Sequence, residues 1–174
     1  MKTRGLGGRN VSEGIIYSGS AISVADSKGR FVLPLEMRKL LKHSSGDNKL
    51  CLSIHSALPC ATGFGLSHKA WLENEVLEME RTARERGLPF DGDAEREARF
   101  ADLEDLNFDD GGRFFLPADI KALIGIDDVI VFSGVSRYIQ MWEPAKLLAS
   151  EGRSPRLRAK VEAFLAERAA GGAK

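Results

Sequence analysis

Two short polar segments of the chain share residue types and a spacing that suit the binding of an anion. The first runs from Asp26 to Arg30 and the second from Asp109 to Arg113, so that each aspartate precedes an arginine by four residues. An aspartate that opens a tight turn can accept hydrogen bonds from the backbone N–H groups that follow it, and it can pair with the arginine. The guanidinium offers a planar fork of donors that fits a phosphate or the O6/N7 edge of guanine. The segments therefore predict two turns that present an arginine to a nucleic acid.

Either segment alone has a plainer interpretation, a salt-bridged hairpin in which the pair only fixes the turn. The surrounding sequence, however, is repeated: residues 26–41 match residues 109–124 at an offset of 83, with Asp, Gly, Arg, Phe, Leu and Pro identical. The bases Arg38 and Lys121 also align. Neither copy alone has enough residues to bury a good core. The repeat therefore predicts two small units related by pseudo-twofold symmetry.

The two turns differ in the residues between aspartate and arginine. Gly29 in the first turn is free to adopt a positive φ, and Gly112 occupies the same place in the second. Lys28 would add one phosphate contact to the first turn. The second turn has Gly111 at the matching position and an additional acid, Asp110. We therefore expect the second turn to offer backbone N–H groups where the first offers a lysine.

Each copy is predicted to fold as strand, turn, strand, helix, hairpin and helix. The predicted strands are rich in β-branched and aromatic residues and lie at 22–25, 30–33, 50–54, 64–66, 129–132 and 138–141. Pro34 suits the first turn of a helix, and Gly125 suits the end of the matching helix in the second copy. These elements must place both arginine-bearing turns.

Other helices are predicted outside the repeated elements. An apolar stripe over residues 67–86 indicates a helix that Gly87 ends, and Asp93 is a plausible N-cap for a short helix through Arg99. Apolar residues within 157–165 indicate an amphipathic helix near the end. Both stripes are most simply explained by packing. Residues 1–12 and 169–174 are expected to be disordered.

The composition is that of an ordinary globular protein. The chain has 174 residues, of which 43% are hydrophobic and 29% charged, and its formal net charge is +0. No apolar run approaches the ~18 residues of a membrane span, and no apolar region follows the basic N-terminus as in a secretory signal. Only Cys51 and Cys60 occur, which favours reduced thiols over a disulfide scaffold. We therefore expect a cytoplasmic protein.

Zero net charge argues against a nucleic-acid partner only where the charge is evenly distributed, and here it is not. Residues 1–42 carry eight basic and three acidic side chains, whereas residues 73–105 carry twelve acidic and five basic ones. Residues 143–174 are basic again, with seven against four. A local basic surface can still attract an anion. We therefore expect a polar molecule whose acidic segment 73–105 faces away from Arg30 and Arg113.

Over residues 15–148 the sequence resembles the MraZ family of transcriptional regulators, within the SpoVT/AbrB superfamily. The resemblance rests on the two Asp-x-x-x-Arg motifs, the Tyr17-Ser18-Gly19 opening and the Leu-Pro that precedes each predicted helix. It implies an α+β fold of two tandem AbrB-like units, each a swapped-hairpin, barrel-like structure. It also implies a ring-shaped homo-oligomer that binds short tandem direct repeats in double-stranded promoter DNA of the division and cell wall gene cluster, as a nucleoid-associated repressor.

Site residues follow from this resemblance position by position. The residues expected to contact DNA are Arg30, Arg113 and Lys28, and those expected to orient the turns are Asp26, Gly29, Asp109 and Gly112. The expected organisation is a disordered basic segment 1–12, a first repeat 13–72, an acidic helical connector 73–99, a second repeat 100–150, and a C-terminal helix with tail 151–174. The basic N-terminal segment is either an arm that reaches DNA or merely a disordered end.

Three other classes of function are weighed against this one. An enzyme is disfavoured because His43, His55 and His68 belong to no recognisable nucleophile or metal motif, and zinc at Cys51, His55 and Cys60 would lack a fourth ligand. We therefore expect no cofactor, no metal and no small-molecule substrate. The alternative is an AbrB-type antitoxin of a toxin–antitoxin pair, which usually carries one copy of the unit and an acidic tail. A scaffold whose turns bind nothing is the third.

Overall fold

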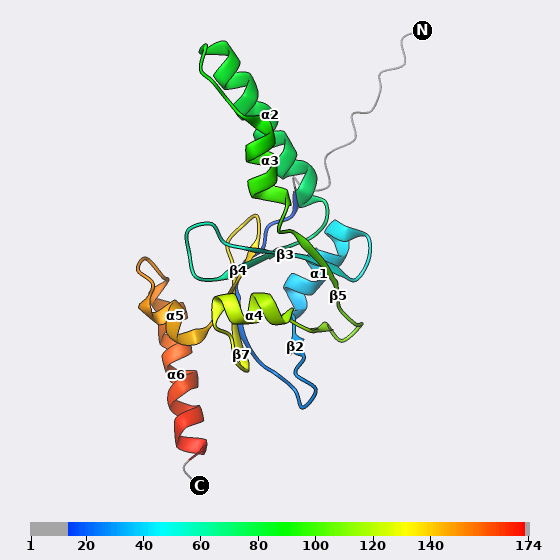
Figure 1. Ribbon diagram of the computed structural model, residues 1–174. Coiled ribbons are helices and arrows are strands. Elements are labelled where there is room, and N and C mark those ends of the chain that lie inside the picture. Colours follow the sequence, from blue (N-terminus) through cyan, green and yellow to red (C-terminus); the bar gives the residue numbers. More distant parts are fainter. Residues whose placement is uncertain (1–13, 173–174) are drawn as a thin grey trace.

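The computed structural model describes residues 14–172 (Figure 1). The strands are β1 (Ser20–Val24), β2 (Phe31–Val32), β3 (Lys49–Ile54), β4 (Ala61–Phe64), β5 (Glu104–Asn107), β6 (Arg113–Phe114), β7 (Val129–Gly134) and β8 (Ile139–Trp142). The helices are α1 (Leu35–Ser45), α2 (His68–Glu85), α3 (Gly92–Phe100), α4 (Ala118–Ile124), α5 (Pro144–Ala149) and α6 (Pro155–Gly171). The predicted α+β class is confirmed.

The strands form a six-stranded antiparallel sheet in the order β1-β7-β8-β4-β3-β5 and a separate two-stranded ribbon of β2 and β6. Each repeat gives its first strand to the other, because β1 pairs with β7 and β5 pairs with β3. Strands β1, β3 and β4 of the first repeat match β5, β7 and β8 of the second. Exchanging each strand with its match gives the same sheet, read from its other edge. The repeats are therefore interleaved rather than placed side by side as separate domains.

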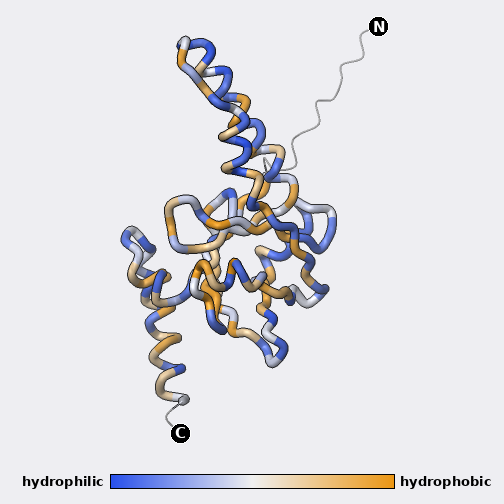
Figure 2. The backbone as a smooth tube through the Cα atoms, in the orientation of Figure 1, coloured by the Kyte–Doolittle hydropathy of each residue, from blue (hydrophilic) through white to orange (hydrophobic). Residues whose placement is uncertain are grey.

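The core is formed by side chains from both repeats. Phe31 and Phe114, one from each ribbon strand, are both 1% exposed, and their ring centroids lie 6.2 Å apart. A second cluster beneath α5 and α6 contains Trp142, Leu147 and Val161, all fully buried. Figure 2 shows apolar segments in the strands of the body and polar segments along α2 and α3. The larger of the two clusters thus includes residues from both repeats, as the size of each copy requires.

The ends of the helices follow the sequence in most places. Pro34 and Pro117 directly precede α1 and α4, where a missing N–H leaves no bond unmade. Gly125 ends α4 in the left-handed conformation at φ 75°, as predicted. A proline therefore directly precedes the matching helix in each copy.

Three local predictions are wrong. The strand predicted at 64–66 lies at Ala61–Phe64, because its pairing with β3 and β8 includes Thr62 and Gly63, whose types obscured it. The N-cap of α3 is Asp91 rather than Asp93: extended backbone at Asp91 lets its carboxylate accept from Ala94 N at 3.0 Å. Helix α6 continues to Gly171, so residues 169–171 are helical. The disorder predicted for residues 1–12 lies outside the described residues.

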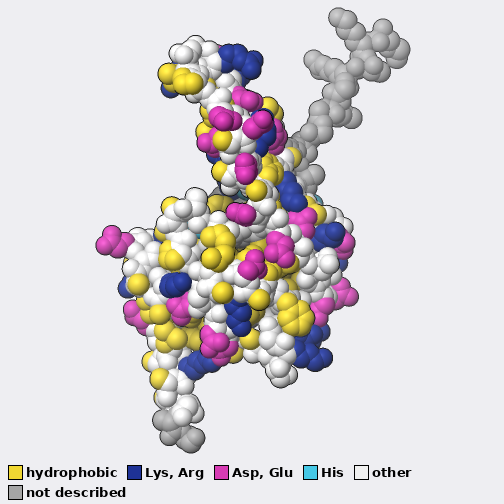
Figure 3. Space-filling model, in the orientation of Figure 1, with side chains coloured by type: hydrophobic (Ala, Val, Ile, Leu, Met, Phe, Trp, Pro, Cys, Tyr) yellow, Lys and Arg dark blue, Asp and Glu magenta, His cyan; other side chains and the backbone are white. Residues whose placement is uncertain are grey.

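Helices α2 and α3 form an antiparallel arm that projects from the upper end of the body in Figure 1. Arg96 bonds to Glu73 at 2.9 Å across the two helices, and Arg99 bonds to Glu75 at 3.1 Å. The visible face of this arm is dense in Asp and Glu (Figure 3). None of the helices in the described part of the chain combines the length and apolar character needed to cross a membrane.

Candidate nucleic-acid interface

The first Asp-x-x-x-Arg segment forms a three-residue hairpin loop held at both ends by Asp26. Backbone bonds join Asp26 N to Arg30 O at 2.9 Å and Gly29 N to Asp26 O at 2.9 Å. Gly29 has φ 81°, the left-handed conformation that such loops place before the second strand. The Asp26 carboxylate accepts from the backbone N–H groups of Lys28 and Arg30, at 3.0 and 2.9 Å. The predicted aspartate-centred turn is therefore present.

The second segment repeats the backbone hydrogen bonds that close this turn. Asp109 N donates to Arg113 O at 3.0 Å, and Gly112 N donates to Asp109 O at 2.8 Å. Gly112 also has φ 81°, and Asp109 Oδ1 accepts from Arg113 N at 2.9 Å. Gly111 stands where Lys28 stands in the first turn. Two segments 83 residues apart thus adopt one local structure because they share the residues that determine it.

Each aspartate also orients the arginine that closes its turn. Asp26 Oδ2 accepts from Arg30 Nε at 2.9 Å and pairs with Nη2 at 2.7 Å. Asp109 Oδ2 accepts from Arg113 Nε at 2.7 Å. The Arg113 side chain is 47% exposed and that of Arg30 is 23% exposed. A guanidinium held on one edge keeps its other donors free for an anion, in a fixed orientation.

The arginines hold both carboxylates in the ionised form. The side-chain hydrogen bond from Arg30 is the largest cause that lowers the pKa of Asp26 from 3.8 to about 2. The backbone hydrogen bond from Arg113, followed by its side-chain bond, lowers the pKa of Asp109. Hydrogen bonds to the charged form favour ionisation. The orientation of both arginines therefore persists at neutral pH.

The register of the β2–β6 ribbon places both arginines on one face. Phe31 pairs with Phe114, and Val32 pairs with Arg113. The two phenylalanines face the core, so alternation puts Val32, Arg113 and the residue two before Val32, which is Arg30, on the opposite face. Diagonal neighbours of this kind lie roughly 7–8 Å apart. The predicted pair of arginines is thus brought together by the ribbon, from two distant parts of the sequence.

Two residues that the sequence did not place at the site lie beside the second turn. Arg38, on α1 of the first repeat, packs directly over Gly112: a methyl group on this glycine would lie 2.8 Å from both Cδ and Nη1 of Arg38. Asn48 Nδ2 donates to Asp110 Oδ1 at 2.9 Å and so binds the additional acid of this turn. Both contacts join residues far apart in the sequence, which explains why neither motif nor spacing revealed them.

The acidic arm stands apart from both turns. In Figure 1, β2 and the turn before it lie at the lower end of the molecule, whereas α2 and α3 project from the upper end. Strand β5 starts at the base of the arm and runs away from it toward the second turn (Figure 1). Of the acids on β5, Asp105 is paired with Lys69 at 2.8 Å. The zero net charge therefore includes an acidic region that is separated in space from the arginines.

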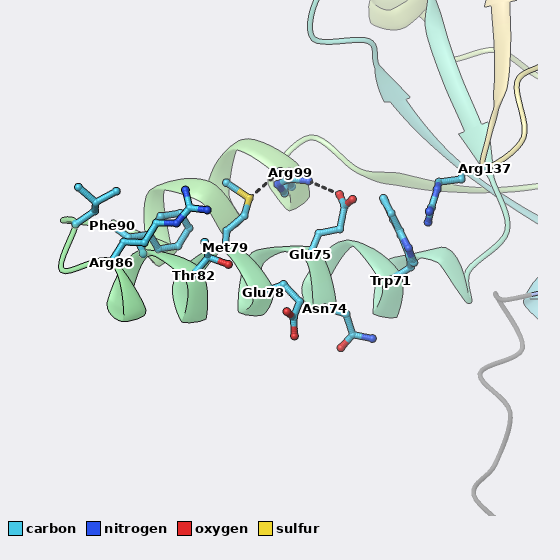
Figure 4. A pocket seen from close by; sticks show the side chains of 12 residues that line it. Trp71, Asn74, Glu75, Glu78, Met79, Thr82, Arg86, Phe90, Arg99 and Arg137 are labelled. Carbon is cyan, nitrogen blue, oxygen red and sulfur yellow. Dashed lines mark hydrogen bonds and ion pairs between the residues drawn. The ribbon is translucent and has the colours of Figure 1, made fainter.

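A groove of about 690 Å³ lies along the arm and not at the turns. Figure 4 shows Trp71 and Arg137 at its base, with Arg99 bonded to Glu75 and to the sulfur of Met79. The Arg137 guanidinium lies 3.9 Å from the centroid of the Trp71 ring. This groove contains none of the residues that form the two turns.

The cysteines and histidines are not gathered into a reactive site in residues 14–172. No group of three His, Cys, Asp or Glu side chains in that range is arranged to hold a metal ion. Burial raises the pKa of both Cys51 and Cys60 to about 12, so these thiols remain protonated. Burial, followed by the charge of Arg137, lowers the pKa of His68 to about 4.

Comparison with known proteins identifies relatives over most of the chain, although no family model matches it. A transcriptional regulator MraZ of Rhodospirillum rubrum is 29% identical over 143 residues, which are 82% of this chain and 89% of that protein. The transcriptional regulator MraZ of Gluconobacter oxydans is 30% identical over 140 residues, 78% of this chain and 80% of its own. That of Thermomicrobium roseum is 27% identical over 145 residues, 80% and 94% respectively. The repeated turns and these extended similarities lead to one conclusion: the chain belongs to the MraZ family.

Proposed function

We propose that this protein is a DNA-binding transcriptional regulator whose two Asp-x-x-x-Arg turns contact double-stranded DNA. The observation that carries the proposal is the matched geometry of the turns, in which Asp26 and Asp109 orient Arg30 and Arg113 on one exposed ribbon face. The relatives are named transcriptional regulators, which supports the same assignment. Guanidinium groups held at their edge by carboxylates suit bidentate recognition of guanine or a phosphate.

The proposed fold behind this function is a tandem pair of AbrB-like units, each of which exchanges its first strand with the other. The pairing of β1 with β7 and of β5 with β3 supports it, as does the palindromic sheet order. The proposed units span 13–72 and 100–150, with 73–99 as the acidic connector and 151–174 as the C-terminal helix and tail. Interleaving fixes the two turns relative to each other, because they leave opposite ends of one ribbon.

The arginines and the lysine of the turns serve different parts of the proposed interaction with DNA. Arg30 and Arg113 read base edges or phosphates, while Lys28 adds a contact to the sugar–phosphate backbone. Since one protomer offers only a few such groups, its affinity alone is low. A ring of identical protomers on tandem direct repeats gains by effective concentration, by roughly 10²–10⁴ when the spacing fits. The proposed targets are such repeats in the promoter of the division and cell wall genes, where binding represses transcription.

The experiment compares the affinity of three variants for two DNA duplexes. One duplex has the sequence immediately upstream of the protein's own gene, and the other is a scrambled duplex of equal length. Arg30→Ala and Arg113→Ala are expected to lose about 1–3 kcal/mol of preference for the upstream duplex. Arg84→Ala is the matched control, because Arg84 is an exposed arginine on the distant arm. Equal affinities and salt slopes in all proteins would refute the proposal.

A further inference from the structure

The two turns have different surroundings although their own geometry is the same. Above Gly29 there is open space, with no atom within 4 Å of a Cβ placed there. Above Gly112 lie Cδ and Nη1 of Arg38, both 2.8 Å from such a Cβ. Gly112 therefore needs to be a glycine for two reasons: its φ is positive, and Arg38 lies where a side chain would be.

The second turn lacks the cation that the first turn carries. Lys28 in the first turn is exposed, whereas Gly111 takes its place in the second turn. Asp110 adds a negative charge to the second loop. A second cation beside Arg113 would give the second turn the positive charge that Lys28 gives the first, and Arg38 lies beside this turn.

The Arg38 side chain packs over Gly112, but its charge has no partner in the described part of the chain. Within residues 14–172, its guanidinium has no hydrogen-bond acceptor or carboxylate partner, whereas the neighbouring Lys39 pairs with Glu36 at 2.8 Å. Arg38 lies in the first turn of α1, whose partial positive charge disfavours a cation. An unpaired cation at a helix N-terminus suggests selection for an anion outside the chain rather than for stability.

The aligned base in the other copy is placed differently. Lys121 lies on α4 near Asp128, whose pKa is lowered first by the hydrogen bond from Arg168 and also by Lys121. Lys121 does not lie over Gly29, since that space is open. The contact of Arg38 with the second turn is thus not a general consequence of the repeat.

We infer that Arg38, from the first repeat, is the phosphate-binding cation of the second turn and takes the role that Lys28 has in the first. Each turn then offers one arginine fixed by an aspartate and a second cation beside it. The inference rests on the proposed function. Arg38 lies on α1 of one repeat and contacts the turn of the other.

The test measures binding of Arg38→Ala and Arg38→Lys to the same upstream and scrambled duplexes across salt concentrations. Loss of one phosphate contact reduces the salt slope by about 0.9 for each protomer bound, which is about fivefold in affinity near 0.15 M salt. Arg38→Ala is expected to weaken binding to both duplexes equally in this way, with no loss of the protein's thermal stability. Arg38→Lys, which keeps a point charge, is expected to restore most of the slope.

The controls separate this inference from the proposed function. Arg84→Ala removes the same charge from the arm and is expected to bind like the wild type. If Arg38→Ala binds like Arg84→Ala while Arg30→Ala and Arg113→Ala are impaired, the inference is overturned and the proposed function stands. A loss confined to the upstream duplex would also overturn it, because a phosphate contact is independent of sequence. If all four bind like the wild type, the proposed function itself is wrong.

Discussion

The two turn glycines offer a pair of matched substitutions that separate backbone strain from the position of Arg38. Gly29→Ala and Gly112→Ala both force an alanine into φ 81°. The left-handed conformation costs a non-glycine residue about 1–2 kcal/mol, and the smaller freedom of alanine in the unfolded chain returns about 0.4–1 kcal/mol. We therefore expect each variant to lose about 1 kcal/mol of unfolding free energy, which is roughly 2–4 °C in Tm.

The two variants should differ in DNA binding. The new methyl group meets no atom at Gly29, but at Gly112 it lies 2.8 Å from Nη1 of Arg38, and this flexible side chain must move away. Urea unfolding and binding to the upstream duplex are measured for both variants and for Gly112→Ala/Arg38→Ala. Gly112→Ala should weaken binding more than Gly29→Ala, and adding Arg38→Ala should weaken it little further, because both changes remove one contact. Equal affinities for the two glycine variants, or independent losses in the double variant, would refute the reasoning.

Three further predictions concern the body that holds the turns. Tyr17→Phe should cost about 1–3 kcal/mol in urea unfolding, because the buried Tyr17 hydroxyl accepts from Gly65 N at 3.1 Å and the N–H would lose its partner. Unfolding free energy should fall as pH falls from 6.5 toward 4, since His68 binds its proton in the unfolded chain first. Leu147→Ala, fully buried beneath α6, should cost about 2–5 kcal/mol in unfolding free energy by urea denaturation.

Each of these predictions has a comparison that can contradict it. Tyr138→Phe is the control for Tyr17, because the Tyr138 hydroxyl is half-buried and its contact with His55 is long, at 3.4 Å. Equal losses in both would argue against the Gly65 bond. His68→Gln should flatten the pH dependence between 6.5 and 4, and an unchanged slope would assign it to other groups. Leu148→Ala, at a half-buried site beside Leu147, should cost less; an equal cost would show that burial does not decide the loss.

Local chemistry made the turns and most helices predictable from the sequence. The residues from Asp26 to Arg30 contain the acceptor, the glycine and the cation that define their own turn, so the structure contains the predicted aspartate-centred turn. The errors occurred where the ends of an element depend on contacts or backbone conformation that the local sequence does not fix. Strand β4 is displaced by three residues because its partners β3 and β8 set its ends. The N-cap of α3 moved to Asp91 because backbone conformation there selected between two nearby aspartates.

The sequence by itself determined that this protein has two copies of an aspartate–arginine turn, each followed by a helix that begins after proline. It could not determine how the copies meet, because the strand pairs that join them connect segments far apart in the chain. The tertiary structure decided that β1 pairs with β7, that β5 pairs with β3, and that the β2–β6 ribbon places Arg30 and Arg113 on one face. It also decided that Arg38 lies on the turn of the opposite repeat, a contact between side chains that no local pattern in the sequence encodes.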